Sequence, residues 1–192
     1  MKVKMLGLVT LLMATMAFAA STASATTLEV GGVTKNQSVT LLASLEPGTS
    51  FVFSRTDGSL ANTCTEAHFH GSTSSPFTGT RVTGALTTKF FAKCSSPVTV
   101  HKSGQFFIEH IAGTTNGTLY FENTEVTVQT PFGNPVNCRS GEGTDVGKVT
   151  GVSSGNATVD FDAVFNCGFL LPSATMKGVF WVTSPGGFGV SA

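Results

Sequence analysis

The chain has 192 residues, with 11 basic and 11 acidic side chains and a formal net charge of zero. Charged residues make up only 11% of the chain and form no basic run, which argues against nucleic acid or an anionic membrane surface as a partner. The chain is rich in threonine and contains 22 Gly and 16 Phe, a composition typical of strands joined by tight turns.

The N-terminal residues have the order of a secretory signal peptide. Positive charges at Lys2 and Lys4 precede an apolar run over 5–20, and the small residues Ala23 and Ala25 form a cleavage signal. The alternative is an uncleaved membrane anchor, but the run is shorter than the roughly 20 residues that a spanning helix needs. We therefore expect a signal peptide over 1–25, a single β domain over 26–192 and no membrane span in the mature chain.

The remainder of the chain predicts short strands and no helix. Turn signals such as Asp57-Gly58 and Asn116-Gly117 separate apolar segments that lack helical periodicity. This spacing favours an all-β fold, either an antiparallel two-layer sandwich of Greek-key or jelly-roll type or a closely related barrel. The predicted strands are 28–33, 38–45, 50–55, 62–70, 77–82, 86–94, 98–101, 105–112, 119–121, 125–129, 136–139, 148–152, 157–167 and 176–183.

The segment 157–167 has the clearest strand pattern. Because successive side chains of a strand point to opposite faces, one face carries only apolar residues and Cys167, while Asp160 and Asp162 lie on the other. A slip by one residue would bury both aspartates, so the register is well specified. The predicted inward residues are Ala157, Val159, Phe161, Ala163, Phe165 and Cys167.

The four cysteines of an exported chain predict two disulfides. Three pairings are possible, and we favour Cys64–Cys94 and Cys138–Cys167, because each closes a loop of about thirty residues that could join adjacent antiparallel strands. The alternation of residues places Cys94 on one face with Leu86, Phe90 and Ala92, which predicts that this face is inward.

A candidate metal site lies on the strand that follows Cys64. Glu66, His68 and His70 share a strand face, and two imidazoles with a carboxylate are ligands that zinc or copper accepts. His101 or His110 could complete the shell. The alternative is a solvated strand end with two exposed histidines.

The same alternation places Cys64 on the face of Glu66 and His68, which conflicts with a buried disulfide. Three explanations are open: a bulge intervenes, the disulfide lies at a sheet edge, or Cys64 is a metal thiolate.

Trp181 and Tyr120 are the one Trp and the one Tyr of the chain, and both fall on the more polar face of their strands. Aromatic rings on a flat sheet face are typical of carbohydrate binding, whereas amphipathic packing at the edge of the core is the alternative.

Three further patterns suggest chemistry, each with a simpler alternative. Asp160 and Asp162 could form a glycosidase pair but are explained as exposed acids. Ser153 lies in a G-x-S-x-G pattern, but a strand rather than a helix is predicted after it, which favours a hairpin turn. Glu142 and Asp145 could hold calcium, although only one copy of the pattern is present and a Gly-rich turn is the better explanation.

The segment 125–130 lacks proline and carries one charge, which predicts an exposed edge capable of strand addition near Val126 and Val128. The alternative is that it lies inside the sheet with its edge already paired.

The segments 109–117, 143–147 and 177–185 resemble a group of uncharacterised exported bacterial all-β proteins. The resemblance covers 60–192 and implies a small secreted β protein without implying an activity. We therefore expect a non-catalytic domain that acts outside the cell or at its surface, through binding or self-association. The alternatives are a metal-binding protein and a carbohydrate-binding or hydrolytic sandwich.

Overall fold

The structure is a computed structural model that describes residues 25–192 except 60, 76–78, 131 and 169–170. The predicted signal peptide, 1–25, lies outside the described residues except for its last residue. The described chain consists of strands, turns and loops, and contains no helix long and apolar enough to cross a membrane. The strands are β1 Thr27–Val30, β2 Val33–Lys35, β3 Thr40–Leu45, β4 Phe51–Arg55, β5 Asn62–Thr73, β6 Arg81–Cys94, β7 Val98–Lys102, β8 Gln105–His110, β9 Gly117–Glu122, β10 Glu125–Gln129, β11 Pro135–Arg139, β12 Thr144–Thr150, β13 Ala157–Asn166, β14 Ser173–Ser184 and β15 Phe188–Ser191.

Eight of these strands close into a ring. The antiparallel pairings run in the order β3, β14, β13, β12, β9, β8, β6 and β5, and β5 pairs with β3 to complete the circle. Closure leaves these strands without a free edge along the paired segments. The all-β prediction is confirmed, and the pairing pattern is that of a closed barrel with additional strands.

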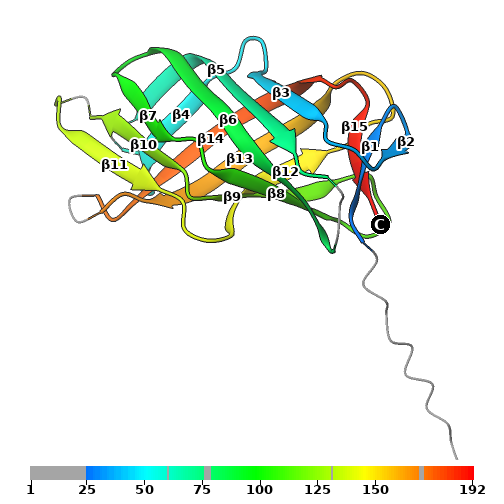
Figure 1. The fold of residues 1–192 in the computed structure, drawn as a ribbon. Coiled ribbons are helices and arrows are strands. Elements are labelled where there is room, and N and C mark those ends of the chain that lie inside the picture. The colour runs from blue at the N-terminus through cyan, green and yellow to red at the C-terminus, as the bar shows by residue number, and fades with distance from the viewer. Residues whose placement is uncertain (1–24, 60, 76–78, 131, 169–170) are drawn as a thin grey trace, which may run out of the picture.

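The additional strands lie at the two ends of the barrel (Figure 1). At one end, β15, β1 and β2 form a separate sheet whose Leu28, Phe188 and Val190 are buried. At the other end, β4 bridges β14 and β5, while β7, β10 and β11 extend from β13. The extension is attached to the barrel at one register pair, Arg139 with Asn166.

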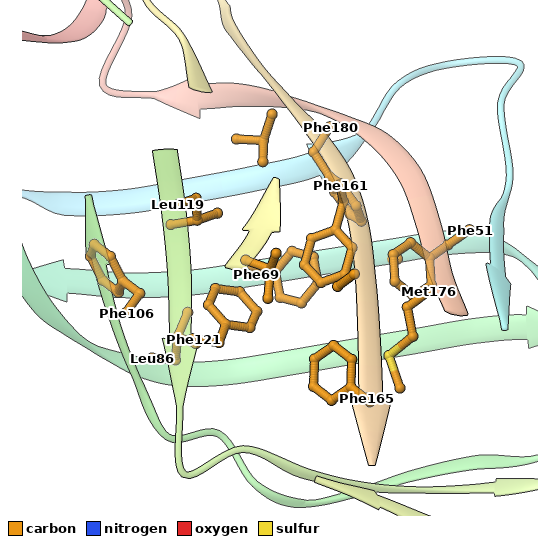
Figure 2. Close-up of a cluster of buried hydrophobic side chains, with 14 of the residues drawn as sticks. Phe51, Phe69, Leu86, Phe106, Leu119, Phe121, Phe161, Phe165, Met176 and Phe180 are labelled. Atoms are coloured by element: carbon orange, nitrogen blue, oxygen red, sulfur yellow. The ribbon is translucent and has the colours of Figure 1, made fainter. Parts of the chain in front are cut away.

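Phenylalanine rings fill the barrel interior. Phe161 lies 5.8 Å from Phe69, 5.6 Å from Phe121 and 5.3 Å from Phe51 between ring centroids, although these residues come from four different strands. Figure 2 shows how these side chains and Phe180 converge on one another. The predicted inward face of β13 is confirmed, because Ala157, Val159, Phe161, Ala163, Phe165 and Cys167 are all buried.

Both favoured disulfides are present. Cys64–Cys94 joins directly opposite positions of β5 and β6, and Cys138–Cys167 joins β11 to the residue after β13. The second bridge therefore fastens the β7–β10–β11 extension close to its single register pair with the barrel.

Several predicted strand boundaries were wrong. The segment 28–33 is a hairpin rather than one strand, because Gly31 and Gly32 adopt positive φ angles of 63° and 71° that a two-residue turn requires. The predicted break between 82 and 86 is absent from β6. Gly84 lies in the continuous strand, where a Cβ atom would come within 2.5 Å of the Phe106 ring. The prediction missed β15 entirely.

The prediction that Phe90 faces inward was also wrong. Thr88 pairs with His70 and Leu86 pairs with Gly71, so Thr87 forms a bulge that reverses the alternation of side chains. Leu86 is consequently buried on one side of the bulge, whereas Lys89 is buried and Phe90 exposed on the other.

The predicted free edge at β10 is likewise corrected. The strand pairs with β7 on one side and with β11 on the other, and Val126 and Val128 are buried. Strand addition at this segment is therefore blocked by pairing that already exists.

Candidate functional site

Five strands present a continuous row of residues on the outer wall of the barrel. The register pairs Thr158 of β13 with Trp181 of β14, Trp181 with Ser44 of β3, Ser44 with His68 of β5, and His68 with Phe90 of β6. We call these five residues the outer row. It brings together Trp181 and His68, which the sequence suggested for two different kinds of site.

The outward orientation of Trp181 follows from the alternation in β14. Its neighbours Phe180 and Val182 are buried in the barrel, so Trp181 lies on the opposite face and is half-buried there. Its indole ring therefore lies at the outer surface of the barrel wall.

His68 faces outward because the alternation changes phase just after the disulfide. Cys64 and Ala67 are both buried, whereas the two residues between them, Thr65 and Glu66, are not. On the opposite strand, Lys93 adopts a positive φ of 49°. The predicted bulge is not observed here, because the register of β5 and β6 has no shift between Cys64 and His70; the side chains change phase within the paired strands, and the disulfide and an outward His68 are compatible.

Side-chain contacts hold the row in place. The His68 Nδ1 atom lies 3.2 Å from the Ser44 hydroxyl oxygen, and the His68 ring stacks on Phe90 with centroids 5.7 Å apart and planes 13° apart. Phe90 is 46% exposed. The row therefore offers aromatic faces and hydrogen-bonding groups on a rigid wall.

Glu66, His68 and His70 of the predicted metal site share the outer face of β5, but each makes separate contacts or none. Glu66 forms an ion pair with Lys93, His68 contacts Ser44, and His70 is exposed. His101 hydrogen bonds to Thr127, and His110 to the carbonyl of Thr114. Among the described residues, no three His, Cys, Asp or Glu side chains are grouped closely enough to hold a metal ion.

Tyr120 lies on a different part of the wall from Trp181. It is on β9, separated from β14 by β12 and β13, and its ring stacks on Phe107 with centroids 4.9 Å apart. The Arg81 guanidinium covers the same Phe107 ring at 4.5 Å and forms an ion pair with Glu109. Burial and then the nearby Glu109 carboxylate raise the pKa of Tyr120. The two predicted ligand-binding aromatics therefore do not share one face.

The residues of the three catalytic or calcium patterns lie in turns or on an exposed strand face. Ser153 lies in the turn before β13, and Asp145 accepts a hydrogen bond from the Gly147 N–H at 2.9 Å. Asp160 and Asp162 line a shallow polar groove of about 560 Å³ over β12 and β13, and Asp162 is ion-paired with Lys177 at 2.9 Å. Both carboxylates come from the same strand and so do not face each other across the groove.

The barrel interior offers little space to a ligand. A cavity of about 60 Å³, lined by apolar residues that include Phe69, Phe106 and Phe188, lies within the packed rings. Ligand pockets usually measure about 300–1,000 Å³. The interior is thus too small for such a ligand, and a binding site is to be sought on the outer wall.

Comparison with protein-family models, with curated proteins and with solved structures finds no match. Ser44, Thr158 and Phe90 are the residues of the site that the sequence did not indicate, and Phe90 was placed on the wrong face because the alternation reverses at the bulge at Thr87. The bulge is defined by the pairing of β6 with β5, which the sequence of β6 does not reveal.

Proposed function

We propose that this protein is an exported, non-catalytic binding domain that acts outside the cell or at its surface, with the outer row as its binding face. The observation that carries the proposal is the alignment of Trp181, His68 and Phe90 across neighbouring strands. Phe90 is exposed and Trp181 and His68 are half-buried, and solvent-accessible aromatic residues arranged together, rather than scattered singly, are typical of interaction sites.

The packed interior supports a surface site over an internal one. The phenylalanine cluster occupies the space that a carrier barrel leaves for its ligand, so binding inside would require several rings to move. Closed strands hold the outer row without such a rearrangement, which lowers the entropic cost of binding.

Export is supported by independent features. The N-terminal residues have the pattern of a secretory signal peptide, and the two disulfides are compatible with an oxidising compartment. The resemblance of 109–117, 143–147 and 177–185 to exported bacterial proteins implies the same location. The proposed place of action is the extracellular space or the cell envelope.

The test is retention of the mature protein, residues 26–192, on insoluble cell-wall and matrix material prepared from bacterial cultures. Wild type should be retained, and Trp181→Ala and Phe90→Ala should each weaken retention by about tenfold. Phe132→Ala is the matched control, because Phe132 is 79% exposed in the β10–β11 turn and outside the row. Equal retention of all four proteins would contradict the proposal, provided that circular dichroism shows that each one is folded.

A further inference from the structure

The outer row carries no Asp, Glu, Lys or Arg at any of its five positions. The charge of Glu66, on the same face of β5 as His68, is balanced by its ion pair with Lys93. A ligand with several charges would lose hydration at this surface without gaining ion pairs in return. The lack of Asp, Glu, Lys and Arg in the row therefore favours a neutral ligand over a charged one.

Stacking surfaces and hydrogen-bonding groups alternate along the row. Trp181 and Phe90 supply aromatic rings, one face of Phe90 being stacked against His68, and Ser44 and His68 between them supply a hydroxyl and an imidazole. Because His68 Nδ1 is directed to Ser44, its Nε2 atom remains for a ligand. Sugar rings combine an apolar C–H face with a rim of hydroxyl groups, which matches this alternation.

The spacing of the two ring platforms indicates a chain rather than a single sugar. Neighbouring strands lie about 4.8 Å apart, so Trp181 on β14 and Phe90 on β6, with β3 and β5 between them, are roughly 14 Å apart. This separation exceeds the length of one sugar ring. A ligand that uses both platforms must extend across the strands.

The row suits a narrow partner better than a protein surface. Around its Phe90 end, the adjacent outward residues are the polar Glu66, His70 and Thr88. A stable protein interface buries about 800 Å² on each partner around an apolar centre. At this end, a line of aromatic groups bordered by polar ones matches a thin chain instead, whereas the apolar Val179 and Leu42 border the row beside Trp181 and Ser44.

We infer that the ligand of the outer row is a neutral polysaccharide that lies across β14, β3, β5 and β6. The chain stacks its sugar rings on Trp181 and Phe90 and hydrogen bonds to Ser44 and His68. This inference rests on the proposed function and specifies its ligand class.

Affinity electrophoresis of the folded mature protein provides the test. The gels contain laminarin, galactomannan or hydroxyethyl cellulose as neutral probes, and heparin as the anionic probe. At least one neutral polysaccharide should retard wild type, with an affinity unchanged between about 50 and 500 mM salt because no charges pair. Trp181→Ala and Phe90→Ala should each weaken retardation about tenfold, Trp181→Phe should retain most of it, and Phe132→Ala should leave it unchanged.

The outcomes separate this inference from the proposed function. If no neutral polysaccharide binds while Trp181→Ala still weakens retention on cell-wall material, the ligand class is wrong and the binding face stands. Salt-sensitive retardation by heparin alone also overturns the ligand class. If a neutral polysaccharide binds equally to wild type, Trp181→Ala and Phe90→Ala, the row is not its site and the inference fails.

Discussion

Phe161 shows how one side chain supports the barrel interior. It is 2% exposed and its ring contacts rings from β4, β5, β9 and β14. Its sequence neighbour Asp160 lies on the wet face of the same strand. Because the two residues are neighbours on one strand but only Phe161 is buried, comparing their substitutions isolates the effect of burial on stability.

We predict that Phe161→Ala lowers the free energy of unfolding by about 3–5 kcal/mol, because it removes a buried ring and leaves a cavity. Asp160→Ala should change it by less than about 0.5 kcal/mol. Urea denaturation of both variants checks the prediction. Equal midpoints would contradict the assigned register of β13.

Lys89 is a charged residue buried in an otherwise largely apolar core. The bulge at Thr87 turns it inward, where it is 8% exposed with its ammonium nitrogen 4.5 Å from the centre of the Phe121 ring. Burial lowers the pKa of Lys89 from 10.5 to about 7. The contact with the aromatic face offsets only part of the cost of removing a charge from water.

We predict that Lys89→Met stabilises the protein most at pH 7 and below. A group whose pKa is lower in the folded state costs stability when it is protonated, and that cost is relieved as the pH rises from about 7 toward 10.5. At low pH the gain of the variant is therefore largest, with an upper bound on the order of 4–5 kcal/mol.

Denaturation of wild type and Lys89→Met from pH 5 to 9 measures this difference. The difference in unfolding free energy should be constant below about pH 7 and shrink above it. A constant difference across the whole range would show that Lys89 keeps an ordinary pKa.

The two disulfides support strands in different ways. Cys64–Cys94 crosses β5 and β6, which also pair from Glu66 with Ala92 to Thr73 with Gly84. Cys138–Cys167 joins β11 to a barrel that it otherwise meets at one register pair. The second bridge therefore does more to hold its strand in place.

We predict that replacing Cys138 and Cys167 by serine selectively loosens β10 and β11. Hydrogen exchange followed by mass spectrometry should show lost protection in these strands, while β13 and β14 remain protected. The bridge closes a loop with a sequence separation of 29, which corresponds to about 3–4 kcal/mol. Replacement of Cys64 and Cys94 is the matched control and should not single out β10 and β11. The same exchange pattern in both variants would contradict this role.

The closed ring makes the barrel one cooperative unit. Each of its eight strands pairs on both sides, and the phenylalanine cluster joins opposite walls. A small domain built in this way unfolds without a populated intermediate.

We predict that wild type with both disulfides unfolds in a single transition. The chain has one tryptophan, so fluorescence reports on Trp181 in the wall while far-ultraviolet circular dichroism reports on all strands. Their denaturation midpoints should coincide. Separate midpoints would indicate that the wall around the outer row unfolds independently.

The sequence by itself determined the strand character and the inward face of β13, and it favoured the observed pairing of the cysteines over two others. These features depend on local alternation, turn residues and loop length, which neighbouring residues along the chain decide. Val164 is the one apolar residue on the outer face of β13, as its position predicts.

Only the tertiary structure decided ring closure and the composition of the candidate site. Thr87 bulges because β5 and β6 change register there, and that register belongs to two strands rather than one. The same change exposes Phe90 and buries Lys89. The outer row forms because β14, β3, β5 and β6 become neighbours, which brings Trp181, Ser44, His68 and Phe90 side by side. The periodicity of a single segment does not indicate which distant strand it will pair with.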